Sequence, residues 1–342
     1  TVRHEIFATG YDVLRNEFNA GAPDGTFEGR RLGLGYLGSY ELNPGLTLMW
    51  GADSTREIAT VQGVGPNETR IDGAFVQGLW APAPGLDLSG TLRMDRNSGF
   101  GSFWSGRLTA SWQASDAVTL RGALARGFRA PAINEQLGNP AWGIAPNPSL
   151  RPETSRSLEL GADYAAGPVL LGATIFALDV DNAITYCTAV ADPWGTPVCP
   201  GPVPGGFSHH YQNLAGASRR HGLELSGQFD LSPDHRLGAA YTYTDARQPD
   251  GSRIGGVPQH DLTLTLDSQW SERLRGALSM QTAAGRVGLP SYTVFNASFR
   301  YALTPQADLT LRIDNILDRQ YQQVAGYATA GRSFYLGVAA RF

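Results

Sequence analysis

The chain has 342 residues, a formal net charge of −4 at pH 7 and 17% charged residues, and all of its 27 basic residues are Arg. This weakly acidic balance gives no reason to expect binding to nucleic acid. The 42 Gly and 21 Pro residues stay below the content of a disordered low-complexity chain. No apolar run approaches the roughly 20 residues that a membrane-spanning helix needs.

Apolar and polar side chains alternate along the chain, which is the signature of strands with two different faces. The alternation is regular in three segments: Leu158, Leu160 and Ala162; Leu262, Leu264 and Leu266; and Leu309, Leu311 and Ile313. A membrane-spanning strand needs only about 10 residues and exposes alternate ones to lipid, so its mean hydropathy stays near zero. The mean hydropathy of −0.21 therefore fits a membrane barrel as well as a soluble sandwich.

The connections between the expected strands fall into two classes of length. Six are short and lie at residues 43–45, 81–85, 115–117, 165–168, 232–235 and 304–307. The longer ones are expected at residues 19–29, 63–69, 132–153, 187–208, 248–258 and 323–331. Short turns at one rim and long loops at the other are typical of outer-membrane barrels, and the count predicts about 16 strands.

Every second strand carries an aromatic residue near its short-turn end, in phase with the apolar residues of that strand. The eight residues are Tyr40, Trp80, Trp112, Tyr164, Phe229, Trp270, Tyr301 and Phe342. Aromatic side chains of membrane barrels gather at the lipid headgroups. We therefore interpret these residues as a membrane girdle, and Phe342 as the end of a C-terminal strand that the barrel assembly machinery recognises.

The two cysteines, Cys187 and Cys199, lie in a Pro- and Gly-rich stretch. Their spacing suits a disulfide that closes a loop in an oxidising compartment. Two free thiols are the alternative, and the CxxC spacing of a zinc pair is missing. We expect the disulfide.

Several segments resemble the TonB-dependent receptor family. The most specific is GFRAP at 127–131 followed by NPSLRPETSRSLELG at 147–161, which is similar to the family's Asn-Pro-x-Leu-x-Pro-Glu element. NLAGASRRHGLEL at 213–225, DNILDRQYQ at 314–322 and GYATAGRSFYLG at 326–337 resemble later hairpins of the family. The resemblance is closest over the last two thirds of the chain and implies a transmembrane antiparallel β-barrel in the bacterial outer membrane.

The resemblance also implies a longer protein. Family barrels have about 22 strands around a plug domain. We therefore expect residues 1–342 to be the C-terminal part of such a barrel, N-terminally incomplete, without the plug, the first strands or the TonB box. The start at Thr1 carries no secretory signal. An unclosed sheet would leave unpaired backbone groups in lipid, so we expect the chain alone to be unstable in a membrane or to close imperfectly.

The ligand is predicted from the closing segment YQQVAGYATAGR at 321–332. It most resembles the cobalamin (vitamin B12) receptors, with ferric-siderophore receptors as the alternative. The resemblance makes Tyr327, at the tip of the last loop, the first candidate for a ligand contact. Weaker candidates on the other long loops are Trp142, Trp194, Arg129, Asn139 and Tyr211.

The residues form no catalytic or metal-binding pattern. Six charged residues on the polar strand faces are expected to line an ion-paired interior: Glu159, Asp163, Glu224, Asp230, Arg312 and Asp314. The adjacent His209 and His210 would point to opposite faces of a strand and could not readily share a metal. We therefore predict no enzyme activity, cofactor or metal, and expect the partners to be outer-membrane lipid, a small-molecule ligand and, in the complete receptor, the TonB system.

Two other classes of protein remain open at this stage. A passive porin of about 16 strands would suit the strand count, but the Asn-Pro-x-Leu-x-Pro-Glu element argues against it. A soluble all-β protein would bury the ring of aromatic residues in a core. If the protein requires detergent to stay in solution, the two membrane-protein hypotheses are favoured over the soluble one.

Overall fold

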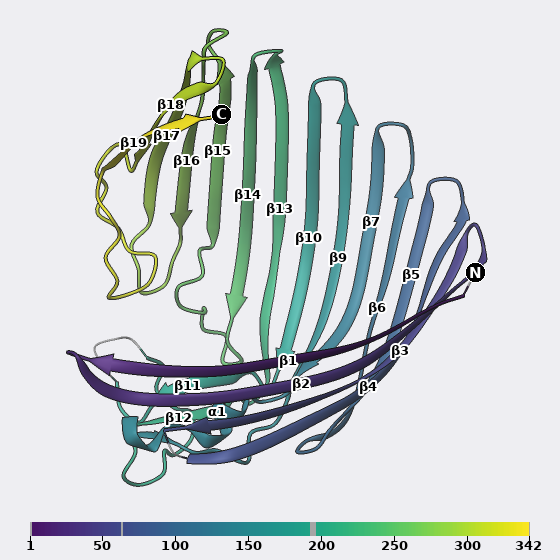
Figure 1. Cartoon of the computed structure of the whole chain (residues 1–342), viewed down its shortest axis with the longest axis vertical. Coiled ribbons are helices and arrows are strands. Elements are labelled where there is room, and N and C mark those ends of the chain that lie inside the picture. Colours follow the sequence, from purple (N-terminus) through teal and green to yellow (C-terminus); the bar gives the residue numbers. More distant parts are fainter. Residues whose placement is uncertain (1, 63, 192–195, 342) are drawn as a thin grey trace. The chain divides into compact units, whose positions relative to one another are not determined.

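The computed structural model describes residues 2–62, 64–191 and 196–341, and these are mostly strands (Figure 1). Sixteen strands form one sheet in the order β1-β2-β3-β4-β5-β6-β7-β9-β10-β13-β14-β15-β16-β17-β18-β19. A second sheet has three strands in the order β11-β12-β8. The helices of the described residues are all too short to cross a membrane.

The chain folds as two compact units. Unit 1 comprises Thr1–Trp112, Gly122–Leu158 and Leu178–Ser218, and unit 2 comprises Gln113–Arg121, Glu159–Ala177 and Arg219–Phe342. The strands of the large sheet are β1 (Val2–Asn19), β2 (Ala22–Asn43), β3 (Leu46–Val61), β4 (Val64–Ala83), β5 (Leu86–Asn97), β6 (Gly101–Gln113), β7 (Val118–Arg129), β9 (Glu153–Ala166), β10 (Val169–Asp181), β13 (Ala217–Ser232), β14 (His235–Arg247), β15 (His260–Gln269), β16 (Leu274–Ala284), β17 (Tyr292–Thr304), β18 (Ala307–Asp314) and β19 (Ser333–Ala340). The small sheet contains β8 (Ile144–Ala145), β11 (Ile184–Thr188) and β12 (His209–Asn213), and the helices are α1 (Ile133–Leu137) and the 3-10 helix η1 (Pro140–Trp142).

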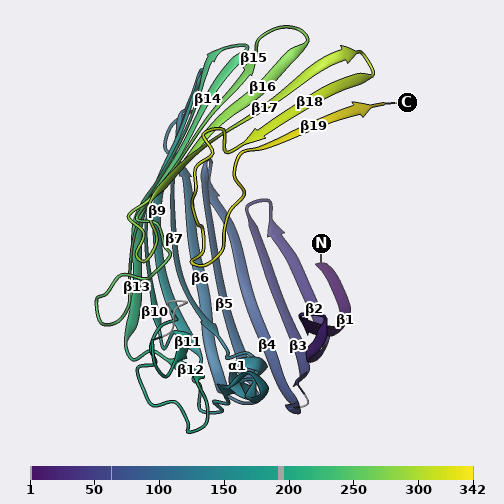
Figure 2. The same ribbon diagram turned by 90° about the vertical axis from the view of Figure 1, so that its left-hand side faces the viewer.

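Strand register keeps apolar residues opposite apolar residues. In unit 1, Tyr40 lies opposite Leu48 and Trp50 lies opposite Val76. In unit 2, where β14 to β19 are neighbours (Figure 2), Leu311 lies between Phe299 and Leu336. Because side chains alternate between the two faces of a strand, this register gathers the apolar residues on one face of the sheet.

The predicted girdle residues lie on that apolar face near the short turns. Seven of them are exposed, between 39% for Tyr301 and 51% for Trp80. Each is within three residues of the end of its strand. Phe342 lies outside the described residues. Exposed rings are expected where lipid covers them, so contact of this girdle with lipid remains a prediction.

The six predicted short turns all connect adjacent strands of the sheet. The long loops predicted at 19–29 and 63–69 are wrong. β1 continues to Asn19 and β2 begins at Ala22, and β3 continues to Val61 before β4 begins at Val64. Ala20 and Gly21 both have positive φ, at 48° and 84°, as a tight hairpin turn requires. These strand ends carry polar residues on both faces, so alternation could not reveal them.

Ion pairs bridge strands on the polar face of unit 1. Asp53 of β3, Gly73 of β4 and Asp95 of β5 lie side by side in the register. The Arg93 guanidinium donates to Asp53 at 2.7 and 3.0 Å and to Asp95 at 2.6 to 3.0 Å. A Cβ at Gly73 would come within 2.0 Å of the Arg93 guanidinium. The missing side chain at Gly73 therefore lets one arginine reach across a strand to two carboxylates.

Replacing Arg93 with Leu should destabilise the sheet, because Asp95, with only 6% of its side chain exposed, loses its counter-charge. We expect the free energy of unfolding to fall by about 2 kcal/mol. Urea unfolding of the native protein in detergent, followed by tryptophan fluorescence, measures it. Arg107→Leu is the control, since Arg107 is exposed and has no ion pair among the described residues. Equal losses in both variants would contradict the role of the bridge.

Candidate functional site

The long connections of unit 1 fold together into a compact structure. We call residues 130–152 and 182–213, without the undescribed 192–195, the first loop assembly. It contains α1, η1 and the small sheet, and Figure 1 shows α1, β11 and β12 together at the long-loop end of unit 1. Within the small sheet, β12 pairs antiparallel with β11 and parallel with β8. Two loops that are far apart in the sequence thus share one sheet.

Arg129, the last residue of β7, holds the base of this assembly. Its guanidinium donates to both oxygens of Glu135 in α1 at 3.0 Å. It also donates to both oxygens of Glu153, the first residue of β9, at 2.8 and 3.0 Å. Glu153 accepts a third bond from the backbone N–H of Ile184 at 2.6 Å. The hydrogen bond to Glu153, with the charge of Glu135, raises the pKa of Arg129. One guanidinium therefore joins both loops to the strand ends.

The Asn-Pro-x-Leu-x-Pro-Glu element also joins the loops through backbone hydrogen bonds. The side chain of Asn147 donates to the Tyr211 carbonyl at 2.7 Å. Asn213 accepts from the Arg151 N–H and donates to the Arg151 carbonyl, both at 2.8 Å. Leu150 is buried at 2% exposure. In this chain the element acts as a brace between two loops.

The helix α1 packs onto the ends of neighbouring strands in unit 1. Ile133 and Leu137 are buried with Val61 of β3, and Phe27 packs against this cluster. Trp142 makes an edge contact with Phe27, with ring centroids 5.7 Å apart. These apolar contacts hold the loop across β2 to β4.

Three aromatic side chains share one face of the small sheet. The Tyr186 ring stacks on His209 with a centroid distance of 5.2 Å and an interplanar angle of 5°. It also contacts Tyr211, which lies directly opposite in the register, at 5.2 Å. Burial, and then the charge of Glu135, raises the pKa of the Tyr211 hydroxyl, so the group stays a neutral donor. This face offers flat rings and a hydroxyl.

The other face of the small sheet carries the disulfide between Cys187 and Cys199. Cys187 is fully buried. His210, on the same face, is also buried, and its imidazole lies 3.1 Å from the Gln212 amide and 3.3 Å from the Pro146 carbonyl. His209 and His210 therefore point to opposite faces. Among the described residues, no cluster of His, Cys, Asp and Glu could hold a metal.

Unit 2 carries a second group of long connections. We call residues 248–259, 285–291 and 315–332 the second loop assembly. Arg286 is buried and donates to the carbonyls of Gln322 at 2.7 Å and Gln323 at 2.6 Å. Its guanidinium also lies over the Tyr292 ring at 5.4 Å, and Tyr292 contacts Tyr321 with centroids 4.4 Å apart. Arg286 thus fastens the last loop to its neighbour.

The last loop is closed at its base and open at its tip. Asn315 bonds to both the N–H and the carbonyl of Arg319, at 2.8 and 2.9 Å, and Asp318 accepts from the Arg332 N–H at 2.8 Å. Thr329 donates to the Tyr321 carbonyl at 2.7 Å. At the tip, Tyr327 is 73% exposed. The base is rigid, while the Tyr327 side chain is available to a partner.

The predicted ligand contacts occupy different environments. Tyr327 and Trp142 are exposed, at 73% and 38%, whereas Asn139 is 4% exposed and its side-chain amide has no partner in the described part of the chain. Arg129 has two carboxylate partners, and Tyr211 is half-buried in the aromatic face. Trp194 lies outside the described residues. A ligand role for each of these residues remains a prediction.

Sequence reasoning missed Tyr186 and Arg286. Tyr186 lies beside Cys187 at the start of a long loop. The short β pattern at 184–188 was the sequence signal that could have identified it. Arg286 had no signal, because its partners are backbone carbonyls 36 and 37 residues further along the chain. A backbone carbonyl is present in every residue, so the sequence does not show which carbonyls an arginine binds.

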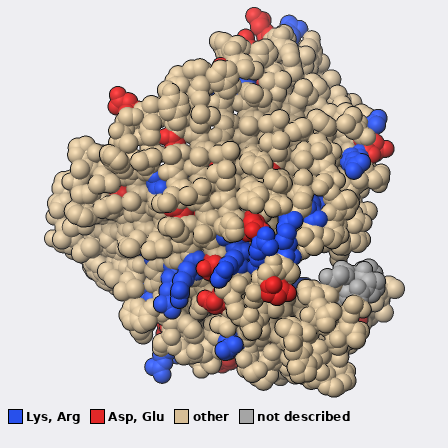
Figure 3. All heavy atoms as spheres, turned by 180° about the vertical axis from the view of Figure 1, so that it is seen from behind, with Lys and Arg blue, Asp and Glu red and all other residues tan. Residues whose placement is uncertain are grey.

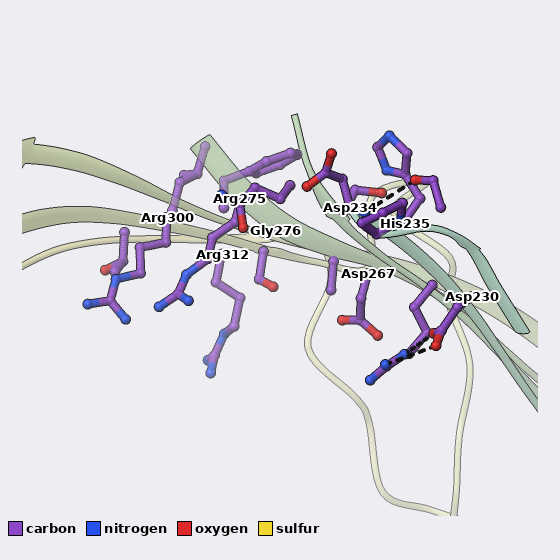
Figure 4. A pocket seen from close by; sticks show the side chains of 18 of the residues that line it. Asp230, Asp234, His235, Asp267, Arg275, Gly276, Arg300 and Arg312 are labelled. Carbon is purple, nitrogen blue, oxygen red and sulfur yellow. Dashed lines mark hydrogen bonds and ion pairs between the residues drawn. The ribbon is translucent and has the colours of Figure 1, made fainter. Parts of the chain in front are cut away.

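A cavity of about 1200 Å³ whose lining includes several charged residues lies at the short-turn end of unit 2. Figure 4 shows Asp230, Asp267, Arg300 and Arg312 pointing to the same side of their strands. Arg236 pairs with Asp230, Arg300 with Asp308, and Arg312 with Asp314. The expected ion-paired polar face is therefore present here, and its groups are a surface for polar contacts.

Replacing Glu153 with Gln should loosen the first loop assembly, because Arg129 loses one of its two counter-charges. We expect amide hydrogen exchange in residues 130–152 and 182–191 to rise about tenfold, which corresponds to roughly 1.4 kcal/mol of local opening. Hydrogen exchange with mass spectrometry on the native protein measures it. Glu224→Gln, at an exposed strand position, serves as the matched control. Unchanged exchange in the Glu153 variant would refute the brace.

Replacing Arg286 with Met should free the last loop, because three backbone carbonyls lose a charged donor. We expect faster cleavage by an added protease within residues 315–332, by about tenfold for a loss of roughly 1.4 kcal/mol. Arg319→Met, in the same loop, is the control, because its side chain donates no hydrogen bond among the described contacts. Equal cleavage of both variants would count against Arg286 as the fastening residue.

Comparison with known proteins identifies the family. Residues 3–316 match the family described as TonB dependent receptor-like, beta-barrel. The iron-regulated outer membrane virulence protein of Vibrio cholerae is 29% identical over 296 residues, which cover 77% of this chain and 43% of that protein. The vitamin B12 transporter BtuB of Vibrio vulnificus is 20% identical over 327 residues, covering 90% of this chain and 49% of that protein. The ferric enterobactin receptor PfeA of Pseudomonas aeruginosa superposes with a TM-score of 0.75 at 20% identity, covering 100% of this chain and 59% of that chain.

The chain thus spans less than half the length of these two curated relatives. The likeness to the solved structure supports the fold alone, because the identity is low. The family match extends over most of the chain and, with the 16-stranded antiparallel sheet, confirms the predicted fold class and the location in the bacterial outer membrane. The chain belongs to the TonB-dependent receptor family and supplies strands and loops of its β-barrel.

Proposed function

We propose that this chain is the ligand-capturing part of a receptor that takes up a scarce nutrient across the outer membrane, and that it is not an enzyme. The observation that carries the proposal is the exposed Tyr327 at the tip of a loop whose base is fastened by Arg286. A rigid base beneath an exposed ring limits the entropy lost when a ligand binds. The aromatic face of the first loop assembly offers a similar surface.

The whole protein is proposed to be longer than residues 1–342. Its relatives extend well beyond the matched region. We assign to the remainder a plug domain, the first barrel strands and a TonB box. In this scheme the loops and the plug capture the ligand, and coupling to TonB in the inner membrane displaces the plug. Lipid and the barrel assembly machinery, which would recognise the C-terminal segment of the chain, complete the set of partners.

A ferric chelate is the first candidate for the ligand. The relative with 29% identity is named for its regulation by iron. Tyr327 in unit 2, and separately Tyr186 with Tyr211 in unit 1, each suit the flat aromatic rings of a catecholate iron chelate, because offset rings attract one another. We therefore rank a ferric chelate above cobalamin as the proposed ligand, although the closing segment taken by itself favours cobalamin.

Cobalamin is the second candidate. The closing segment at 321–332 resembles the cobalamin receptors, and the vitamin B12 transporter of Vibrio vulnificus is 20% identical over 90% of this chain. A corrin ring would also lie flat against tyrosine. The two candidates differ in charge and size, so direct binding measurements distinguish them.

The deciding measurement uses the protein as purified from the outer membrane in detergent. Ferric enterobactin and cyanocobalamin are added separately, and binding is followed by isothermal titration calorimetry. Tight binding of the iron chelate alone supports the first candidate, and tight binding of cyanocobalamin alone supports the second. Binding of neither probe would rule out both candidates and point to a different nutrient. Free diffusion of small sugars through the protein in liposomes would overturn the receptor proposal in favour of a porin.

Replacing Tyr327 with Ala should weaken binding of whichever probe binds, by about tenfold or 1.4 kcal/mol, because an exposed aromatic anchor is lost. The same calorimetric titration measures the effect. Leu317→Ala is the matched control, since Leu317 is 65% exposed in the same loop and should leave affinity unchanged. If the two variants bind alike, Tyr327 is not the contact.

A further inference from the structure

A shallow groove of about 610 Å³ crosses the apolar face of unit 1. Its floor consists of glycines on three neighbouring strands: Gly78 of β4, Gly90 of β5 and Gly106 of β6. Gly78 lies directly opposite Gly90, and Leu92 lies opposite Gly106. Since glycine has no side chain, this patch of the sheet is lower than its surroundings.

Apolar side chains form the walls of this groove. They are Val76, Leu92, Trp104, Leu108 and Leu124, and all five are at least 50% exposed. A groove of this lining fits a hydrocarbon chain, because large apolar side chains remain exposed unless something apolar covers them.

Two arginines stand at the long-loop end of the same groove. Arg126 of β7 and Arg156 of β9 both line it, and both are exposed. In the described part of the chain, neither has a carboxylate within ion-pair distance. By contrast, Arg56 and Arg70, further along this face, pair with Glu68 and Asp72. Arg126 and Arg156 are therefore positive charges available to an external anion.

Arginines follow the apolar residues on this face of neighbouring strands, as Arg126 follows Leu124 on β7. On β5 the apolar face runs from Leu86 to Met94, and the next residue on that face is Arg96. Eight residues of strand span about 27 Å, and at a tilt of about 40° this gives a height of about 20 Å, close to the apolar band of a membrane barrel. Figure 3 shows arginine side chains gathered in a band on one face, with acidic side chains between them.

We propose that this groove binds a phosphate-bearing lipid of the outer leaflet. One acyl chain lies over Gly78, Gly90 and Gly106, and the phosphate lies between Arg126 and Arg156. Guanidinium groups bind phosphate through paired N–H donors, which matches the chemistry at this end of the groove. The charge of the two arginines selects an anionic lipid over a zwitterionic one, and the apolar walls select a lipid over a free anion.

The test uses the native protein extracted in mild detergent, with native mass spectrometry to count bound lipids. The probe is bisphosphorylated lipid A, and phosphatidylcholine and inorganic phosphate are the comparison ligands. We expect lipid A to bind at least tenfold more tightly than either. Equal binding of phosphatidylcholine would overturn the role of the arginines, and equal binding of inorganic phosphate would overturn the role of the groove.

Two sets of variants locate the site. Arg126→Gln with Arg156→Gln should weaken lipid A binding by at least tenfold, whereas Arg275→Gln with Arg319→Gln, two exposed arginines outside the groove, should not. Gly78→Leu should also weaken binding, because its Cβ has room, with the nearest atom 3.9 Å away, and the longer side chain then fills the groove floor. Full affinity in the Gly78 variant, or equal losses in both arginine pairs, would refute the proposal.

Discussion

The backbone hydrogen bond is the constraint from which this structure follows. In the hydrocarbon core of a bilayer each unpaired backbone N–H or C=O costs several kcal/mol, so a chain that crosses it with strands must pair them along their whole length. Long antiparallel hairpins meet this requirement, and the strands of this sheet run up to 22 residues. Side chains then alternate between two faces, and each face acquires its own chemistry.

On the polar face, charged residues bind one another across strands, and glycine decides where they can do so. Arg93 reaches Asp53 only because Gly73 lies between them. On the apolar face, glycine has a different effect. Gly78 and Gly90 leave a groove there, and no charged side chain in the described part of the chain crosses them. The same residue type thus serves ion pairing on one side and lipid on the other, because its neighbours differ.

Beyond the lipid, the strand ends enter water and the loops must be ordered by other means. Arg129 and Glu153 tie two loops to the ends of β7 and β9, and Asn147 and Asn213 satisfy backbone groups between the loops. The Asn-Pro-x-Leu-x-Pro-Glu element is therefore a structural brace in this chain. It supports the first loop assembly with its aromatic face, whereas the proposed ligand contact at the exposed Tyr327 belongs to the second loop assembly.

Local pattern was enough to predict the strands inside the membrane, the short turns and the rings near them, because lipid on one face imposes alternation on every residue it touches. Leu309, Leu311 and Ile313 carry that signal plainly. It disappears where both faces meet water, which is why the long-loop ends of the β1–β2 and β3–β4 hairpins were mistaken for loops. The long-range partners of Arg129, Asn147 and Arg286, which are Glu153, Tyr211 and Gln322, lie 24, 64 and 36 residues away. Such contacts depend on which loops the folded sheet brings together, and no local pattern records that, so the tertiary structure alone decided them.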